Sequence, residues 1–243
     1  MNEIVKTYGL TKTYGDTTVV NNLDLNVAEE RIYGFLGPNG AGKSTTLKML
    51  LELVKPSKGE IDIFGKRFNA KNRISILKNI GSLIETPSYY GHLTAKENLE
   101  ILRILLDAPK GNIEKVLSIV RLDNQQNKKV SAFSLGMKQG LGLASAMLAF
   151  PKLLILDEPT NGLDPAGIQE MRELIRSLPK EYGMTVIVSS HLLSEIDQMA
   201  DDIGIIANGK LKFQNSLAVL HEMHKSENLE DIFLELTGKD VSL

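Results

Sequence analysis

The most informative stretch of the chain is a glycine-rich loop that spans residues 37–45 and reads Gly-Pro-Asn-Gly-Ala-Gly-Lys-Ser-Thr. Because glycine tolerates backbone angles that other residues resist, the spacing Gly-x-x-x-x-Gly-Lys-Ser lets successive backbone N–H groups turn toward one anion. Lys43 is placed to reach the β- and γ-phosphates of a nucleotide, and the Ser44 hydroxyl to bind Mg²⁺. The loop therefore predicts a phosphate site formed by Gly37, Pro38, Asn39, Gly40, Ala41, Gly42, Lys43, Ser44 and Thr45.

Two carboxylates and a histidine have the chemistry to complete a nucleotide-hydrolysing site. Asp157 and Glu158 follow an apolar run at 153–156, and His191 follows another at 185–190. Beside a phosphate loop, Asp157 is predicted to join the metal shell and Glu158 to polarise a water against the γ-phosphate. His191 is predicted to contact the γ-phosphate. The alternatives are a carboxylate pair at a helix N-terminus and a histidine with a structural role.

These residues can act together only if the fold brings them to one edge of a sheet. Residues 32–36 form a short apolar run before the glycine loop, and residues 46–51 have the apolar spacing of a helix after it. The runs at 153–156 and 185–190 are wholly or mostly apolar, as in strands buried inside a parallel sheet. Ligands of open α/β sheets bind at the carboxyl ends of the strands, so the sequence predicts one shared site there.

The rest of the chain divides into segments that differ in their pattern of apolar and polar residues. Residues 3–30 alternate apolar and polar and predict short antiparallel strands, separated by turns at 14–16 and 21–22, and 60–64 repeats the alternation. From 87 to 150 the pattern is helical, with a capping box at 94–97 and further helices at 113–120 and 137–148. Later segments predict a helix capped by Asp164, a short helix at 194–200 and a hairpin turn at Asn208–Gly209.

We therefore predict an α/β fold with a P-loop NTPase core. The core is formed by residues 1–86 and 150–215 and includes an antiparallel β subdomain. Residues 87–149 are expected to form an inserted helical subdomain, and residues 216–243 a helical tail.

Composition narrows the function classes. The chain has 243 residues, a net charge of -2 and no cysteine. The charge gives no basic field for nucleic acid, and the lack of cysteine excludes disulfides and thiol catalysis. The N-terminus lacks a secretory apolar region, and the longest weakly polar run, 141–150, is short of the roughly 18 residues of a membrane span. We expect a cytoplasmic protein that reaches a membrane only through a partner.

Taken in order, the motifs resemble the ATP-binding subunit of ABC transporters over residues 3–215. The glycine loop matches Walker A, Asp157 and Glu158 match the Walker B aspartate and the catalytic glutamate, and His191 matches the switch histidine. Residues 133–137, Phe-Ser-Leu-Gly-Met, match the signature motif with three substitutions. The resemblance implies a single ABC ATPase domain over 1–243 that converts ATP and water to ADP and phosphate.

The resemblance also implies further contacts with ATP and further partners. Tyr14 matches the aromatic residue that stacks on adenine, and Asp164 belongs to the D-loop. Two subunits would pack head to tail, with Ser134 and Gly136 donating to the γ-phosphate of the partner's ATP. Transmembrane permease subunits would hold the ATPase at the inner face of the cell membrane. They would dock in a cleft lined by Thr86, Pro87, Tyr89 and Tyr90.

Two positions depart from the common pattern of the family. Glu85 stands where the Q-loop glutamine is usual, and Gly140 where an arginine commonly follows the signature. We expect Glu85 to join Ser44 and Asp157 as a Mg²⁺ ligand. A glutamate here resembles the ATPases of bacitracin-type and lantibiotic-immunity exporters, so peptide-antibiotic export is the function we predict, with Lys43, Glu158 and His191 as catalytic residues.

Other functions remain alternatives. A soluble ABC ATPase of translation usually has two cassettes in one chain, and one of DNA repair has a long inserted coiled coil; this sequence has neither. A nucleotide-binding regulator without turnover should lack Glu158 or His191, and both are present. An ABC exporter subunit with another cargo is also an alternative.

Overall fold

The computed structural model describes residues 2–223 and 229–238. Its central element is a six-stranded sheet in the order β11-β10-β4-β9-β8-β7. The strands from β10 to β7 run parallel, and β11 pairs antiparallel with β10 at one edge. The strands are β4 (Ile32–Leu36), β7 (Ile80–Leu83), β8 (Leu153–Asp157), β9 (Thr185–Ser190), β10 (Asp202–Ala207) and β11 (Lys210–Ser216).

The apolar runs of the sequence form the middle of this sheet, as predicted. Every residue of β4, β8 and β9 is buried. Successive side chains of a strand point to opposite faces. In β8, Leu154 and Leu156 pack in one apolar core, whereas Leu153 and Ile155 pack in the other. The sheet is therefore covered on both faces, which explains why its central strands are apolar without alternation.

A second, antiparallel sheet covers one of these faces. Its path is β2-β1-β5-β6, and β3 pairs with β1. One prediction about this region is wrong: the turn expected at 21–22 lies inside β2, whose last pairs with β1 are broken by an irregularity. Asn22 takes a left-handed φ of 51° there, and its N–H donates to Thr11 Oγ1 at 3.0 Å, so the strand continues through a bulge. The strands are β1 (Glu3–Tyr14), β2 (Thr17–Leu23), β3 (Asn26–Ala28), β5 (Lys58–Ile63) and β6 (Lys66–Arg67).

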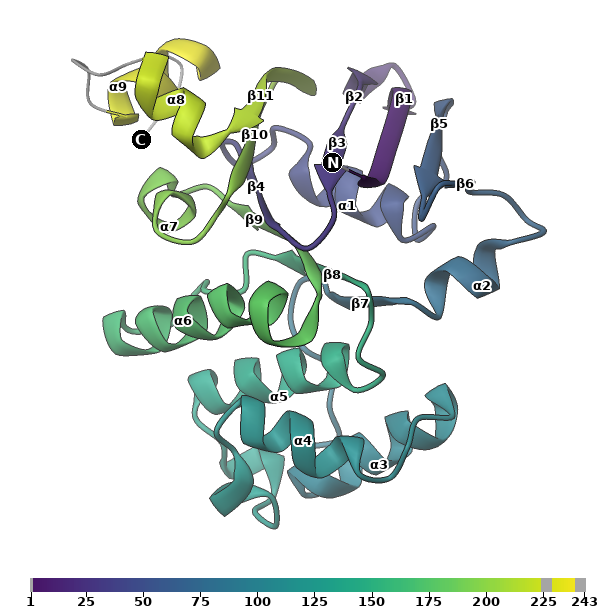
Figure 1. Ribbon diagram of the computed structural model, residues 1–243, viewed down its shortest axis with the longest axis vertical. Coiled ribbons are helices and arrows are strands. Elements are labelled where there is room, and N and C mark those ends of the chain that lie inside the picture. Colours follow the sequence, from purple (N-terminus) through teal and green to yellow (C-terminus); the bar gives the residue numbers. More distant parts are fainter. Residues whose placement is uncertain (1, 224–228, 239–243) are drawn as a thin grey trace.

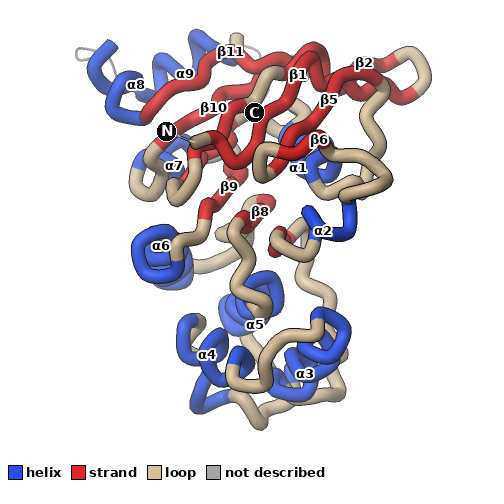
Figure 2. The backbone as a smooth tube through the Cα atoms, turned by 45° about the vertical axis from the view of Figure 1, so that its right-hand side comes forward, coloured by secondary structure: helices blue, strands red, loops and turns tan. Residues whose placement is uncertain are grey.

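Helices of the middle region gather at the end of the molecule opposite α8, α9 and β11 (Figure 1). Figure 2 shows the strands concentrated in the other half of the molecule, with β8 and α6 lying between the two halves. The predicted capping box is present at the start of α3, where Thr94 Oγ1 accepts from the N–H of Glu97 at 3.2 Å. The helices of this block are α3 (Ala95–Leu106), α4 (Asn112–Ile119) and α5 (Leu135–Met147).

Several helix boundaries differ from the predicted ones. α5 begins two residues before the predicted start because Ser134 is its N-cap and accepts from the N–H of Met137 at 3.3 Å. α7 (Leu193–Asp197) is shorter than predicted, since Gln198 already caps it. By contrast, the predicted start of α6 (Pro165–Tyr182) is confirmed, because Asp164 is its N-cap. The other α-helices are α1 (Lys43–Leu50), α2 (Arg73–Leu77), α8 (Leu217–Met223) and α9 (Leu229–Thr237), and two 3-10 helices span Asp123–Gln125 and Val130–Ala132.

The end of the described chain contains the predicted hairpin. Asn208 and Gly209 join β10 to β11 with φ values of 50° and 73°, as a tight turn with two left-handed residues requires. The predicted helical tail contains α8 and α9, and its residues 224–228 and 239–243 lie outside the described part. Within the described ranges, none of the helices combines the length and the hydropathy that a membrane crossing requires.

Candidate functional site

The glycine loop connects the carboxyl end of β4 to the N-terminus of α1. A Cβ atom at Gly37 would lie 2.3 Å from the carbonyl oxygen of Ile206, and one at Gly42 would lie 2.6 Å from that of Val19. Gly42 also has a φ of 107°, so both positions require glycine. The N–H of Gly209 in the β10–β11 turn donates to the carbonyl of Ala41 at 3.0 Å. The loop is thus held by the strands around it in one backbone conformation.

Lys43 is a buried cation inside this loop. Its Nζ donates to the carbonyl of Gly37 at 2.7 Å and to that of Pro38 at 3.3 Å, and it lies 3.4 Å from Glu158 Oε1. Only 5% of the residue is exposed. Burial lowers the pKa of Lys43, and the carboxylate of Glu158 opposes that shift. A buried ammonium with carboxylate and carbonyl partners is suited to binding an anion such as phosphate.

Asp157 and Glu158 lie at the end of β8, next to the end of β9. Ser189 is the register partner of Asp157, and its hydroxyl donates to Asp157 Oδ1 at 2.5 Å. The same hydroxyl accepts from the backbone N–H of Glu158 at 3.0 Å. Glu158 has a left-handed φ of 48°, which ends the strand. Ser189 therefore fixes both acidic residues.

Sequence reasoning missed Ser189. The signal that could have identified Ser189 is a hydroxyl residue near the end of an apolar strand, if that strand is the neighbour of the strand that ends in the acidic pair. The pairing of β8 with β9 was needed to place the two strands side by side.

His191 directly follows β9 and lies beside Glu158. Its Nδ1 is 3.3 Å from Glu158 Oε2, within ion-pair distance but without a hydrogen bond in this orientation. Glu158 thus contacts Lys43 through one carboxylate oxygen and His191 through the other. The structure brings together these three residues, predicted from three separate motifs, at the carboxyl ends of β4, β8 and β9.

Glu85 has a cationic partner that the sequence analysis did not foresee. It follows β7 with a left-handed φ of 60°, and its Oε1 lies 2.6 Å from Nζ of Lys48 on α1. This hydrogen bond lowers the pKa of Glu85 and raises that of Lys48. The Glu85 side chain is 67% exposed. Its charge is therefore compensated by a lysine one turn along the helix that begins with Lys43 and Ser44.

The remaining predicted ATP contacts lie on other elements: Tyr14 on β1, Asp164 before α6, and Ser134 and Gly136 at the start of α5. Tyr14 ends β1 and is half exposed, with Lys12 Nζ 4.7 Å from the centre of its ring. Asp164 accepts from the N–H of Gly167 at 2.9 Å and so caps α6. Ser134 and Gly136 lie at the start of α5, where a Cβ at Gly136 would come no closer than 3.9 Å to Leu163.

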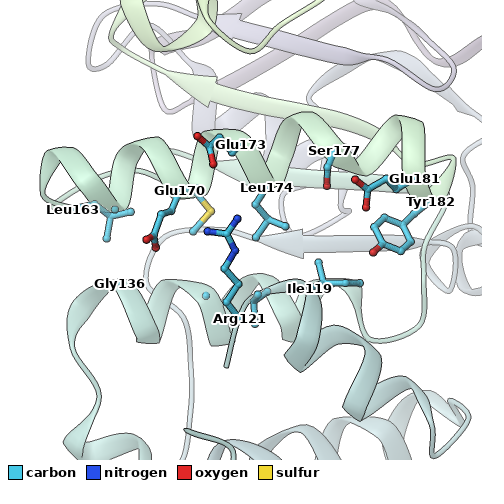
Figure 3. Close-up of a pocket in the computed structure, with 14 residues that line it drawn as sticks. Ile119, Arg121, Gly136, Leu163, Glu170, Glu173, Leu174, Ser177, Glu181 and Tyr182 are labelled. Atoms are coloured by element: carbon cyan, nitrogen blue, oxygen red, sulfur yellow. The ribbon is translucent and has the colours of Figure 1, made fainter. Parts of the chain in front are cut away.

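Two hollows flank the helical block. One has a volume of about 280 Å³ and lies between α5 and α6. Figure 3 shows Gly136 on one wall, Glu170 and Glu173 on the other, and Arg121 reaching between them. The second has about 570 Å³ and lies between β7, α3 and α5. It is lined by all four residues of the predicted docking cleft, Thr86, Pro87, Tyr89 and Tyr90, together with apolar residues that include Leu53, Leu102 and Leu105.

Comparisons with known proteins identify the family of the chain. The ABC transporter family model matches residues 20–161. The bacitracin transport ATP-binding protein BcrA of Bacillus licheniformis is 56% identical over 212 residues, which cover 87% of this chain and 69% of that protein. The lantibiotic transport ATP-binding protein SrtF of Streptococcus pyogenes is 44% identical over 230 residues, which cover 95% of this chain and 96% of that protein.

Solved structures show the same architecture. An ATP-binding subunit of an ABC transporter superposes with a TM-score of 0.85 at 28% identity, covering 97% of this chain and all of the other. A dimeric ATP-binding cassette in a post-hydrolysis state with ADP and Pi superposes with a TM-score of 0.78 at 27% identity, covering 88% of this chain and 98% of that chain.

The fold and the glycine loop with its acidic pair define a P-loop ATPase. The chain belongs to the ABC transporter family, as an ATP-binding subunit that hydrolyses ATP. Subunits of this family act with permease subunits and form dimers.

Proposed function

We propose that this subunit powers the export of a peptide antibiotic of the bacitracin or lantibiotic type, and so gives immunity or resistance. The observation that carries the proposal is the identity of 56% to BcrA and 44% to SrtF, the latter over nearly the full length of both chains. Glu85, at the position where a glutamine is usual in the family, supports the same group. An exporter subunit for another cargo is the alternative.

We infer a role in hydrolysis for Lys43, Glu158 and His191, because the two contacts of Glu158 support it. We assign Lys43 to the β- and γ-phosphates, because an ammonium in a cradle of backbone groups stabilises negative charge that develops there. Phosphate oxygens would replace the Glu158 carboxylate as its acceptor, which leaves Glu158 to orient and polarise the attacking water. His191, 3.3 Å from Glu158, is placed to orient that carboxylate and to donate to the γ-phosphate.

The same site offers oxygen ligands of the kind that Mg²⁺ prefers. Ser44 lies in the first turn of α1, and Asp157 is close enough to α1 for its charge to oppose, together with Glu158, the lowering of the Lys43 pKa by burial. The buried Asp157 carboxylate is fixed by Ser189, so its orientation is set before a metal binds. We therefore assign Ser44 and Asp157 to the Mg²⁺ ion, with Glu85 as the further ligand that the sequence suggests. When bound, the ion neutralises charge on the phosphates.

A second subunit and a permease complete the proposed machine. We assign Ser134 and Gly136 to the ATP bound by a partner in a head-to-tail dimer, and Tyr14 and Asp164 to contacts around the nucleotide. The 570 Å³ groove is the proposed permease dock, because its apolar lining and its two tyrosines suit burial of a short helix. We propose that the subunit sits at the inner face of the cell membrane and touches it only through the permease.

We assign a function to each of the segments that the sequence predicted. We assign ATP binding to residues 1–86 and 150–215, and the signature and one wall of the dock to residues 87–149. In the tail, Leu217 and Leu220 of α8 and Ile232 of α9 pack in the core. Ile232 of α9 belongs to the same apolar core as Ile203 and Ile205 of β10, and α9 contacts β10.

The antibiotic susceptibility of the host tests whether the exported cargo is a peptide antibiotic. The gene is deleted and then restored either as wild type or as Glu158→Gln, and minimal inhibitory concentrations are measured for bacitracin, a lantibiotic and two unrelated antibiotics. We expect deletion to sensitise the host to one of the peptides only, with rescue by wild type and not by Glu158→Gln. Unchanged sensitivity to both peptides would contradict the proposed cargo.

A further inference from the structure

A buried carboxylate outside the predicted motifs, Glu195, links the turn that follows Glu158 to the turn that contains His191. Glu195 lies on α7, is 7% exposed, and accepts two hydrogen bonds on the same oxygen, Oε2. One comes from Thr160 Oγ1 and the other from Ser190 Oγ, each at 2.8 Å. Both hydroxyl residues are also buried, at 5% and 3% exposure. Because all three side chains are buried, a water molecule could accept the hydrogen bonds of Thr160 and Ser190 in place of Glu195 only if the surrounding side chains moved.

Each donor is close in sequence to a residue of the site. Ser190 immediately precedes His191, and its hydroxyl also accepts from the N–H of Leu192 at 3.0 Å, so the turn around His191 is tied on both sides. Thr160 follows Glu158 by two residues, in a turn where the N–H of Asn161 donates to the carbonyl of Glu158 at 3.1 Å. One oxygen of Glu195 thus joins the turn of the histidine to the turn of the glutamate.

We propose that Glu195 is a positioning residue for ATP hydrolysis. By holding Thr160 and Ser190 together, Glu195 sets the distance between Glu158 and His191. The inference rests on the proposed roles of Glu158 and His191. Glu195 touches neither ATP nor these two side chains in our assignment, so it should govern the rate of the chemical step and leave ATP binding at Lys43 unchanged. A displacement of about 1 Å in such a site costs up to about 100-fold in rate.

Three variants separate positioning from mere stability. Glu195→Met keeps the volume and removes the acceptor, Glu195→Gln keeps an acceptor oxygen, and Thr160→Val removes one donor without changing shape. Thr7→Val is the matched control, because Thr7 is 2% exposed and makes comparable buried hydrogen bonds in β1, to Leu23 and Leu25 at 2.7 Å. ATP turnover per folded molecule, KM for ATP and the thermal midpoint are measured for the purified full chain, with Glu158→Gln assayed in parallel.

We expect Glu195→Met to lower kcat by about 10- to 100-fold with little change in KM, Thr160→Val to lower it less, and Glu195→Gln to stay close to wild type. Thr7→Val should lose stability and keep its kcat. Unchanged kcat in Glu195→Met, or equal loss in Glu195→Gln, overturns the inference. If Glu195→Met does not fold, Thr160→Val decides by the same comparison with Thr7→Val. Full ATP turnover in Glu158→Gln would instead refute the proposed roles of Glu158 and His191, on which the inference rests.

Discussion

Nζ of Lys48 and Oε1 of Glu85 lie 2.6 Å apart and join the helix after the glycine loop to the loop after β7. Ile84 and Thr86, on either side of Glu85, line the groove proposed as the permease dock. The pair therefore connects the nucleotide side of the molecule to the docking side. It also gives the unusual glutamate a compensating charge, since Lys48 holds the pKa of Glu85 below its ordinary value.

Removing Lys48 should change the titration of Glu85. In Lys48→Met we expect the pKa of Glu85 to rise to its ordinary range, measured by carbon NMR of the side-chain carboxyl. Because the folded-state pKa is lowered, the pair stabilises the fold above the unfolded-state value of Glu85 and loses that effect as the pH falls through the folded-state pKa. Lys96→Met is the control: it breaks the similar pair with Glu114, 3.1 Å apart, and should leave Glu85 unchanged. An unchanged Glu85 pKa in Lys48→Met would contradict the pairing.

Lys43→Ala should abolish hydrolysis and weaken ATP binding. Losing a charge-assisted contact to phosphate costs about 10- to 100-fold in affinity. Equilibrium binding of a fluorescent ATP analogue measures this, and Lys58→Ala on the exposed part of β5 is the control with unchanged affinity. Near-normal binding and turnover in Lys43→Ala would defeat the assignment of the glycine loop.

Gly136→Ala tests the head-to-tail dimer without disturbing the subunit. A Cβ at Gly136 meets only Leu163 at 3.9 Å, and one at Gly140, on the same helix, meets nothing closer than 3.8 Å. Both variants should therefore fold. In a Glu158→Gln background with ATP, Gly136→Ala should reduce the dimer seen by size-exclusion chromatography, because the proposed dimer places Gly136 against the partner's nucleotide, where an added methyl group would interfere. Gly140→Ala should keep it. Equal dimer in both would argue against a signature contact at Gly136.

If the groove is the permease dock, changes in it should leave ATP hydrolysis intact and weaken the coupling of hydrolysis to transport. Tyr89→Ala combined with Tyr90→Ala should leave the ATPase activity of the isolated subunit largely intact, yet weaken co-purification with the permease and reduce protection against the exported peptide. Glu85→Gln should likewise retain hydrolysis and alter coupling. Tyr182→Ala is the control, since Tyr182 is exposed to a similar degree as Tyr89 but lines the other hollow. Wild-type co-purification and protection in the double variant would show that the dock is elsewhere.

Local patterns predicted the parts of the site that depend on neighbours in sequence. The glycine loop, the apolar strand before Asp157 and the position of His191 after β9 follow from composition and periodicity within a few residues. Asp164 and Thr94 are caps, which are also local features.

Contacts between distant segments could not be predicted in this way. Ser189 with Asp157, Lys48 with Glu85 and Glu195 with Thr160 join residues that lie 32, 37 and 35 positions apart. Each depends on which strands are neighbours in the sheet and how the loops after them turn. The turn wrongly predicted at 21–22 has the same origin, because pairing with β1 stabilises a bulge where the sequence alone favours a break.

Single-turnover hydrolysis in Glu158→Gln tests the central claim most directly. Radiolabelled ATP is mixed with excess purified subunit, and the release of phosphate is followed together with ATP retained on the protein. The account predicts that Glu158→Gln binds ATP as tightly as wild type, elutes as an ATP-bound dimer and releases phosphate at least about 100-fold more slowly, because the amide cannot polarise the water. Phosphate release at the wild-type rate would show that Glu158 is not the residue that drives the reaction.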